Sequence, residues 1–176
     1  MTSRDFFEWQ TSGGAGDVRR LVDTLESCQI PWCMIGGLAV NHWAAEPLVT
    51  RDVDIVIAAQ RLEEAVAALE AAGFAAERHE WSINLRGTGA VTIQITTEAD
   101  YADFPQRAVA ADVHGILMRV ASREDTLVGK VRAWSDEQRR PSKRQKDLLD
   151  ITRLVEAHPA LWEQLPATLQ KIVPRP

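Results

Sequence analysis

One unit near the start of the sequence constrains the fold more than any other. A short apolar run at residues 31–35 ends in the pair Gly36-Gly37, and a helical pattern of apolar residues resumes at 38–45. This order predicts a strand, a glycine turn and a helix. Glycine leaves the backbone N–H groups uncovered at such a turn, and the dipole of the following helix favours a phosphate. The unit is therefore a candidate phosphate site, although a Gly-Gly pair also occurs in ordinary tight turns.

Two aspartates follow this unit, at the start of a second predicted strand at residues 50–57. Side chains alternate along a strand, so Asp52 and Asp54 point to the same side. Two like charges this close repel, unless the strand end is solvated or a divalent cation such as Mg²⁺ binds between the carboxylates. Thr50 and Arg51 could add a hydroxyl and a charge-assisted bond to the same phosphates. The chemistry that this suggests is phosphoryl or nucleotidyl transfer.

The rest of the pattern mixes strands with helices and then becomes wholly helical. The further predicted elements are a helix capped by Asp17, a helix at 61–72 ended by Gly73, a hairpin of strands 81–85 and 90–96, a strand at 116–120, and helices at 122–134 and 142–156. This order predicts an α+β fold, with a mixed β-sheet flanked by helices and a helical C-terminal part. We expect one compact domain, composed of a leader and helix (1–29), a core (30–121) and the helical part (122–176).

Composition excludes several classes of protein. The 25 acidic and 20 basic residues give a net charge of −5, which argues against a surface that is basic throughout, although a local basic patch remains open. Cys28 and Cys33 match neither a disulfide framework nor a zinc site. No apolar stretch approaches the ~20 residues of a membrane helix, and the N-terminus lacks the pattern of a secretory signal. We therefore expect a soluble, cytoplasmic protein without membrane contact.

Three segments carry a resemblance to a known superfamily. They are Met34-Ile35-Gly36-Gly37-Leu38-Ala39-Val40-Asn41, Thr50-Arg51-Asp52-Val53-Asp54-Ile55 and Lys143-Arg144-Gln145-Lys146-Asp147-Leu148-Leu149-Asp150-Ile151. Together they resemble the signature of the DNA polymerase β-like nucleotidyltransferases and, within it, the small AbiEii-like group. That group includes toxins of type IV toxin–antitoxin systems, and its distant relatives include enzymes that adenylylate antibiotics. The resemblance covers roughly residues 30 to 155.

The resemblance implies a nucleoside triphosphate as substrate and Mg²⁺ as cofactor. Gly36, Gly37 and the following helix would hold the triphosphate, and Asp52 and Asp54 would bind the Mg²⁺ ions that position it. In such proteins a third carboxylate on a neighbouring strand commonly activates the acceptor hydroxyl.

Gln94 occupies the likeliest position for that third group. An amide can hydrogen-bond a hydroxyl but cannot accept its proton. Either Asp52 or Asp54, Glu98 or Asp100 nearby, or water then takes the proton, or catalysis is absent. Loss of a general base costs about a hundredfold to ten-thousandfold in rate, which slows such an enzyme without abolishing it.

The two C-terminal helices add candidate phosphate ligands. We expect Lys130 and Lys146 to meet phosphate oxygens, with Asp150 orienting Lys146. The alternative for the latter pair is a surface contact between residues four apart on a helix. The basic run at residues 139–146 could grip an RNA backbone, or could be a solvated face.

Three classes of function follow. The first is an enzyme that transfers a nucleoside monophosphate from an NTP to an acceptor hydroxyl, with either RNA or a small molecule such as an aminoglycoside as acceptor. The net acidity favours a cationic small molecule, and the toxin-like resemblance favours RNA. The second is a degenerate nucleotide-binding module without turnover. The third is a structural partner domain that an antitoxin neutralises.

Overall fold

The computed structural model describes residues 14–50, 52–113 and 115–176, and its centre is a mixed β-sheet. Within these residues the sheet has seven strands in the order β3-β4-β5-β2-β1-β7-β6. Their bounds are β1 (Trp32–Ile35), β2 (Asp52–Ile57), β3 (Ala75–Arg78), β4 (Ser82–Arg86), β5 (Thr92–Thr96), β6 (Val109–Val113) and β7 (Ile116–Val120). The central strand β2 lies parallel to β5 and antiparallel to β1. Strands of both senses in one sheet, flanked by helices, confirm the predicted α+β class.

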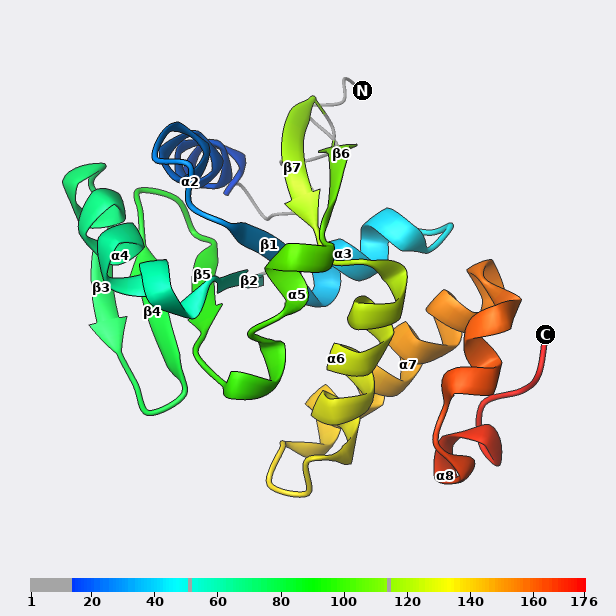
Figure 1. Ribbon diagram of the computed structural model, residues 1–176. Coiled ribbons are helices and arrows are strands. Elements are labelled where there is room, and N and C mark those ends of the chain that lie inside the picture. The colour runs from blue at the N-terminus through cyan, green and yellow to red at the C-terminus, as the bar shows by residue number, and fades with distance from the viewer. Residues whose placement is uncertain (1–13, 51, 114) are drawn as a thin grey trace.

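The helices form two groups around this sheet. Their bounds are α2 (Ala15–Ser27), α3 (Gly36–Trp43), α4 (Leu62–Ala71), α5 (Phe104–Arg107), α6 (Arg123–Ser135), α7 (Pro141–Ala157) and α8 (Ala167–Gln170), with 3₁₀ turns η1 (Ala59–Arg61), η2 (Ala99–Tyr101) and η3 (Pro159–Gln164). Figure 1 shows α2 and α4 close to the sheet, whereas α6, α7 and α8 form a separate group on the C-terminal side. None of the helices in the described ranges has the length and apolar character needed to cross a membrane.

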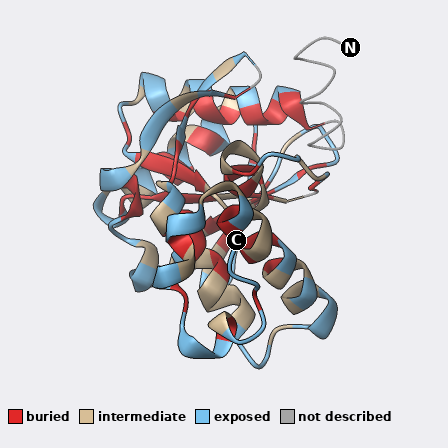
Figure 2. Cartoon of the chain, turned by 90° about the vertical axis from the view of Figure 1, so that its right-hand side faces the viewer, coloured by how far each residue is buried: buried red, intermediate tan, exposed pale blue. Residues whose placement is uncertain are grey.

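The pleat divides the central strands into an apolar face and a polar face. On β2, Val53 and Ile55 belong to the main core, which also contains residues of α2 and α4. Figure 2 shows buried residues following the sheet and the helix surfaces turned toward it. Burying an aliphatic side chain of this size contributes about 1.5–3 kcal/mol. The alternate residues Asp52 and Asp54 lie on the opposite face, because successive side chains of a strand point to opposite sides.

The C-terminal helices have an apolar cluster of their own. Leu127 of α6 and Ile151 of α7 are buried together with Val40 of α3. Helix α3 packs against both α6 and α7, so it connects this helical group to the sheet. Since α3 begins where β1 ends, this packing brings α6 and α7 beside the polar ends of β1 and β2.

The strands and long helices that the sequence predicts are formed. Ser122 accepts a hydrogen bond from the backbone N of Asp125 at 3.0 Å and caps α6, as its capping pattern indicates. Gly73 follows α4 with a φ of +97°, the left-handed conformation that favours glycine at this position. The hairpin also forms, with β4 and β5 antiparallel.

The prediction that Asp17 caps the first helix is wrong. Helix α2 begins at Ala15 after Gly14, so Asp17 lies inside its first turn. The carboxylate of Asp17 is buried, and it accepts hydrogen bonds from the backbone N of Thr88 at 3.1 Å and of Gly89 at 2.7 Å. It therefore anchors the β4–β5 loop to α2, a contact between distant segments that the local sequence does not reveal.

Two strands were not predicted from the sequence. Both β3 and β6 lie at the edges of the sheet, and most of their residues are exposed or half-buried. An edge strand buries little on either face, so its residues show no clear alternation of apolar and polar side chains.

Candidate active site

The glycine turn lies directly against one of the two aspartates. The register of β1 and β2 pairs Ile35 with Asp54, so the next residue, Gly36, reaches the Asp54 side chain. Gly36 has a φ of +68°, and a Cβ at this position would overlap the Asp54 carboxylate. A Cβ on Gly37 would lie 3.1 Å from Oγ1 of Thr50. The close approach of backbone to carboxylate thus requires glycine at position 36, and the two predicted halves of the site come together.

Gln94 lies beside the aspartate pair, where the sequence placed it. The parallel register of β2 and β5 sets Asp54 opposite Gln94 and Asp52 opposite Thr92. Asp54 and Gln94 line the same cavity. Within the described residues, no group of three or more acidic, His or Cys side chains is arranged to hold a metal ion. The third position of the site therefore carries an amide, and Asp52 and Asp54 are its carboxylates.

The cavity has a volume of about 150 Å³ and lies between the polar face of the sheet and the C-terminal helices. Its charged and polar lining includes Asp54, Gln94, Lys130 and Arg139. Asp52 lies outside this lining, and its side chain is 42% exposed. The site thus combines an enclosed aspartate with a second, more accessible one.

Two aromatic residues in the cavity lining were not predicted. The rings of Tyr101 and Phe104 meet edge to face with their centroids 5.1 Å apart, and both residues line the cavity. Burial raises the pKa of Tyr101, so its phenol stays neutral. Both residues belong to the short elements η2 and α5, whose sequence pattern resembles that of a loop.

Burial and the neighbouring charges act on the pKa of Asp54 in opposite directions. Burial raises the pKa of Asp54, Lys130 lowers it, and the charge of Asp52 raises it again. The side chain of Asp54 forms no hydrogen bond or ion pair with any other residue that the structure describes. A desolvated carboxylate without a direct partner gains free energy from a cation beside it.

Lys130 holds a fixed positive charge at this cavity. Its Nζ lies 3.1 Å from Oδ1 of Asp147 and 2.8 Å from Oδ2 of Asp150, both on α7. Burial alone would lower the pKa of Lys130, but the two carboxylates raise it above the ordinary value. Lys130 therefore remains an ammonium group although its side chain is only 10% exposed.

The predicted pairing of Asp150 with Lys146 is wrong. Asp150 pairs with Lys130 on α6 and, at 3.0 Å, with Arg153. Asp147 and Asp150 are three residues apart, so both face α6, whereas Lys146 is rotated by about 100° from Asp147 around the helix. Lys146 is half-buried and does not line the cavity.

Two other basic residues reach the site, Arg139 from the connection between α6 and α7 and Lys143 from the first turn of α7. Nζ of Lys143 lies 3.1 Å from Oδ2 of Asp52, and Nε of Arg139 lies 2.6 Å from Oδ2 of Asp147. The sequence indicated the basic run but not which of its residues would reach the carboxylates. That selection depends on how α7 packs against α6.

Thr50, Glu98 and Asp100 lie outside the cavity lining. Thr50 is buried, and its Oγ1 donates to the backbone O of Asp52 at 3.1 Å, so it supports the start of β2. Arg51 is outside the described residues. Glu98 and Asp100 both pair with Arg132, at 3.6 Å in the case of Glu98. Neither acid lines the cavity, so neither is placed to accept a proton there.

Comparisons with known proteins identify the family and the fold of the chain. The family model "Nucleotidyl transferase AbiEii toxin, Type IV TA system" matches residues 20–173. Among functionally curated proteins, none matches the sequence significantly.

Three solved structures illustrate the shared fold. The antibiotic-resistance factor ANT(2'')-Ia in complex with adenylyl-2''-tobramycin has a TM-score of 0.67 at 18% identity, covering 89% of this chain and 97% of that one. A putative nucleotidyltransferase from Helicobacter pylori has a TM-score of 0.60 at 16% identity, covering 92% and 74%. The lincosamide antibiotic adenylyltransferase LnuA, with lincomycin bound, has a TM-score of 0.56 at 15% identity, covering 80% and 97%. At such identities the likeness shows the fold, whereas the family match spans nearly the whole sequence, and the chain belongs to the AbiEii nucleotidyltransferase family.

Proposed function

We propose that the protein transfers a nucleoside monophosphate from an NTP to a hydroxyl of an RNA acceptor, with Mg²⁺ as cofactor. The observation that carries this proposal is the packing of the bare Gly36 backbone against the Asp54 carboxylate, with Lys130 in the same cavity. An anion site and a cation site then lie side by side, as a metal–triphosphate complex requires.

The donor set suits Mg²⁺. Asp52 and Asp54 present carboxylates on one face of β2, and Asp54 is desolvated without a direct partner among the described residues. Mg²⁺ commonly binds one or two carboxylates and completes its shell with water and substrate phosphates. When bound, it would supply a Lewis acid that offsets the charge developing on the phosphoryl oxygens.

The residues around the carboxylates would hold the triphosphate. Helix α3 begins at Gly36, where the uncovered backbone and the helix dipole favour an anion. Lys130 faces the same cavity with its charge secured by two buried aspartates. A pre-oriented cation of this kind costs little reorganisation when negative charge moves during transfer.

The acceptor hydroxyl would meet Gln94 and Asp54. Gln94 can orient the hydroxyl by a hydrogen bond but cannot take its proton. Of the lining carboxylates, Asp125 is paired with Arg107 at 2.9 Å and Asp147 with Lys130 and Arg139. Asp54 is therefore the lining carboxylate left to accept the proton.

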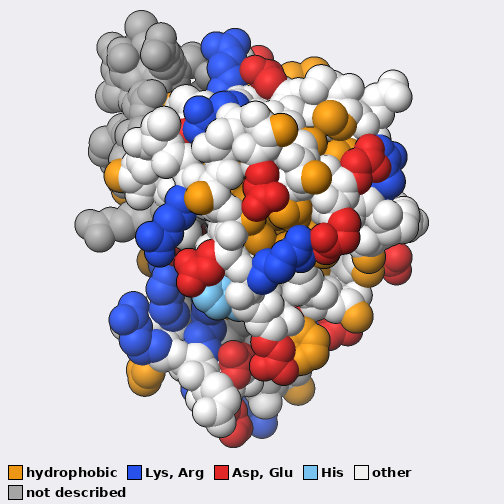
Figure 3. All heavy atoms as spheres, turned by 90° about the vertical axis from the view of Figure 1, so that its left-hand side faces the viewer, with side chains coloured by type: hydrophobic (Ala, Val, Ile, Leu, Met, Phe, Trp, Pro, Cys, Tyr) orange, Lys and Arg blue, Asp and Glu red, His pale blue; other side chains and the backbone are white. Residues whose placement is uncertain are grey.

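The distribution of charge favours a polyanionic acceptor over a cationic one. Most carboxylates around the cavity already form ion pairs with Lys or Arg side chains, so few are free to bind the amino groups of an aminoglycoside. Between residues 139 and 146 five of eight side chains are Lys or Arg and none is acidic. On the face shown in Figure 3, Lys and Arg side chains gather at the lower left and are interspersed with Asp and Glu elsewhere. The basic run next to the site suits an RNA backbone.

Labelled NTPs can test the proposal directly. The protein is incubated with each α-³²P-labelled NTP and Mg²⁺, in the presence of total RNA or of an antibiotic panel. We expect the label to appear in RNA. This incorporation should disappear when EDTA is added and when the Asp54→Asn variant replaces the wild type. Label in an antibiotic would show that the acceptor is a small molecule and not RNA. Nucleotide binding without any transfer would instead identify a non-catalytic module.

A toxin-like role follows from the same proposal. The family description names type IV toxin–antitoxin systems, so we propose that an antitoxin partner counteracts the protein in the cytoplasm. Expression of the wild-type chain alone should arrest bacterial growth, and Asp54→Asn should relieve the arrest. Equal growth inhibition by both forms would argue against toxicity through transfer.

A further inference from the structure

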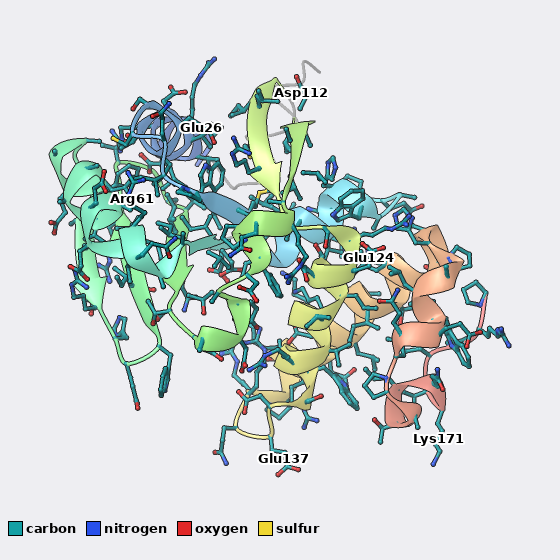
Figure 4. The ribbon with its side chains drawn as sticks, viewed as in Figure 1. Glu26, Arg61, Asp112, Glu124, Glu137 and Lys171 are labelled. Carbon is teal, nitrogen blue, oxygen red and sulfur yellow. The ribbon has the colours of Figure 1, made fainter. Side chains whose placement is uncertain are left out.

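A second ion pair lies at the mouth of the site, between Lys143 in the first turn of α7 and Asp52 at the start of β2. Their Nζ and Oδ2 atoms are 3.1 Å apart, and the two side chains are 41% and 42% exposed. The residues are 91 positions apart in the sequence, so this contact joins the helical part to the sheet at the carboxylate pair. Figure 4 labels Glu137, which lies on the connection between α6 and α7, and α7 begins shortly after it.

Lys143 differs from the other cations of the site in its freedom to move. Lys130 is held by two aspartates whose side chains are at most 2% exposed, and Arg139 is bound to one of them. Lys143 has a single exposed partner, and an exposed pair of this kind is weak because water and salt screen it. A lysine ammonium on a flexible four-carbon stem can also turn to another acceptor.

The position of Lys143 places it in competition with a metal ion. Its ammonium occupies one oxygen of Asp52, one of the two carboxylates that the proposed Mg²⁺ site offers. Two adjacent carboxylates repel each other, and a cation beside them relieves this repulsion. Lys143 supplies that cation when no other is bound, and a divalent ion with a triphosphate would displace it.

We propose that Lys143 is a displaceable counter-ion of the site. Its ammonium neutralises Asp52 before the metal–nucleotide complex arrives. When the complex binds, the Lys143 side chain turns away from Asp52 and its ammonium pairs with a triphosphate oxygen instead. No covalent bond changes in this step: the ammonium keeps its proton and exchanges one anionic oxygen partner for another. The inference rests on the proposed function, since it assumes the metal and triphosphate sites. Its consequence is that metal alone binds poorly, whereas metal and triphosphate bind well together.

Two binding measurements separate this role from a structural one. Binding of Mn²⁺ alone is followed by the EPR signal of the free ion, and binding of the Mg²⁺ complex of inorganic tripolyphosphate by calorimetry. In Lys143→Met we expect Mn²⁺ alone to bind roughly two- to fivefold more tightly, because its competitor is gone. Mg-tripolyphosphate should bind roughly fivefold or more weakly, because a charge-assisted bond is lost.

Two further variants serve as controls. Lys143→Arg keeps a cation beside Asp52 and should hold Mn²⁺ affinity near the wild-type value. Arg140→Met removes one exposed charge just before α7, three residues from Lys143, and the Arg140 side chain pairs with no described carboxylate. We expect it to change Mn²⁺ affinity less than Lys143→Met does.

The outcomes distinguish the inference from the function on which it rests. Shifts of both affinities in the same direction, or no shift in Lys143→Met, would refute the counter-ion role while leaving the metal site intact. If neither the wild type nor Lys143→Met binds Mn²⁺ or Mg-tripolyphosphate, both the proposed function and the inference fail.

Discussion

The two faces of β2 differ in what they bury and in what they can do. Val53 and Ile55 are 1% and 0% exposed and belong to the main core. Asp52 and Asp54, which alternate with them along the strand, lie on the other face with the glycine turn and Gln94. The difference teaches that one strand can secure the fold with one set of side chains and supply the chemistry with the other. Substitutions on the two faces should therefore separate stability from activity.

The largest effect should come from the polar face. Asp54→Asn keeps the shape of the side chain but removes a metal-binding charge, so we expect transfer to fall roughly a thousandfold or more. Its melting temperature without Mg²⁺ should not fall, because the variant no longer buries a charge. Labelled-NTP turnover and thermal unfolding measure the two quantities. A matched change of an exposed aspartate, Asp136→Asn, should leave both near their wild-type values. Retention of activity in Asp54→Asn would mean that the pair is not the metal site.

The buried ion cluster beside the polar face should couple the two properties. Lys130→Met leaves Asp147 and Asp150 buried without their main partner, which should cost about 3–5 kcal/mol in the free energy of unfolding. Urea unfolding measures this loss. Adding Asp147→Asn and Asp150→Asn should restore much of the stability but not the transfer activity. If the triple variant recovers both, Lys130 is a structural residue only.

On the apolar face, the change should affect stability alone. Ile55→Ala removes a fully buried side chain, and we expect a loss of about 2–5 kcal/mol in the free energy of unfolding. Activity per folded molecule should stay close to the wild-type value at low temperature. A marked fall in the activity of fully folded Ile55→Ala would show that the two faces of β2 are coupled after all.

The smallest expected effect concerns the reactivity of Cys33, which shows where the water-accessible part of the polar face ends. Cys33 lies on the same side of the sheet as the site, but it packs with Val56 and Phe104 in an apolar cluster. Burial raises its pKa to about 12, and the charge of Asp125 adds to this. At pH 8 Cys33 should resist iodoacetamide, because the thiolate is the reacting form, whereas the half-buried Cys28 should react. Peptide mass spectrometry, with a guanidinium-unfolded sample as reference, distinguishes the two. Equal labelling in the folded state would show that this part of the face opens to water.

The sequence predicted those parts of the site that belong to short, recognisable segments of the chain. Gly36 and Asp54 belong to two short motifs whose order and spacing indicate their chemistry. The family resemblance implies a third group on a neighbouring strand, and alternation within that strand points to Gln94. The partners of Asp52 and Asp150 could not be predicted in this way. Lys143 and Lys130 meet them through the packing of α7 against α6 and β2, and residues far apart in sequence carry no mark of such a meeting.

The sequence by itself determined the α+β class, the strand–turn–helix unit and the side of β2 on which the carboxylates lie. Each of these follows from a local rule: the period of a strand or helix, or the steric freedom of glycine. Only the tertiary structure decided which cation serves which carboxylate, and that Asp17 ties a distant loop to α2. Such pairings depend on distances across the folded chain, which are set by the packing of whole elements and not by neighbouring residues.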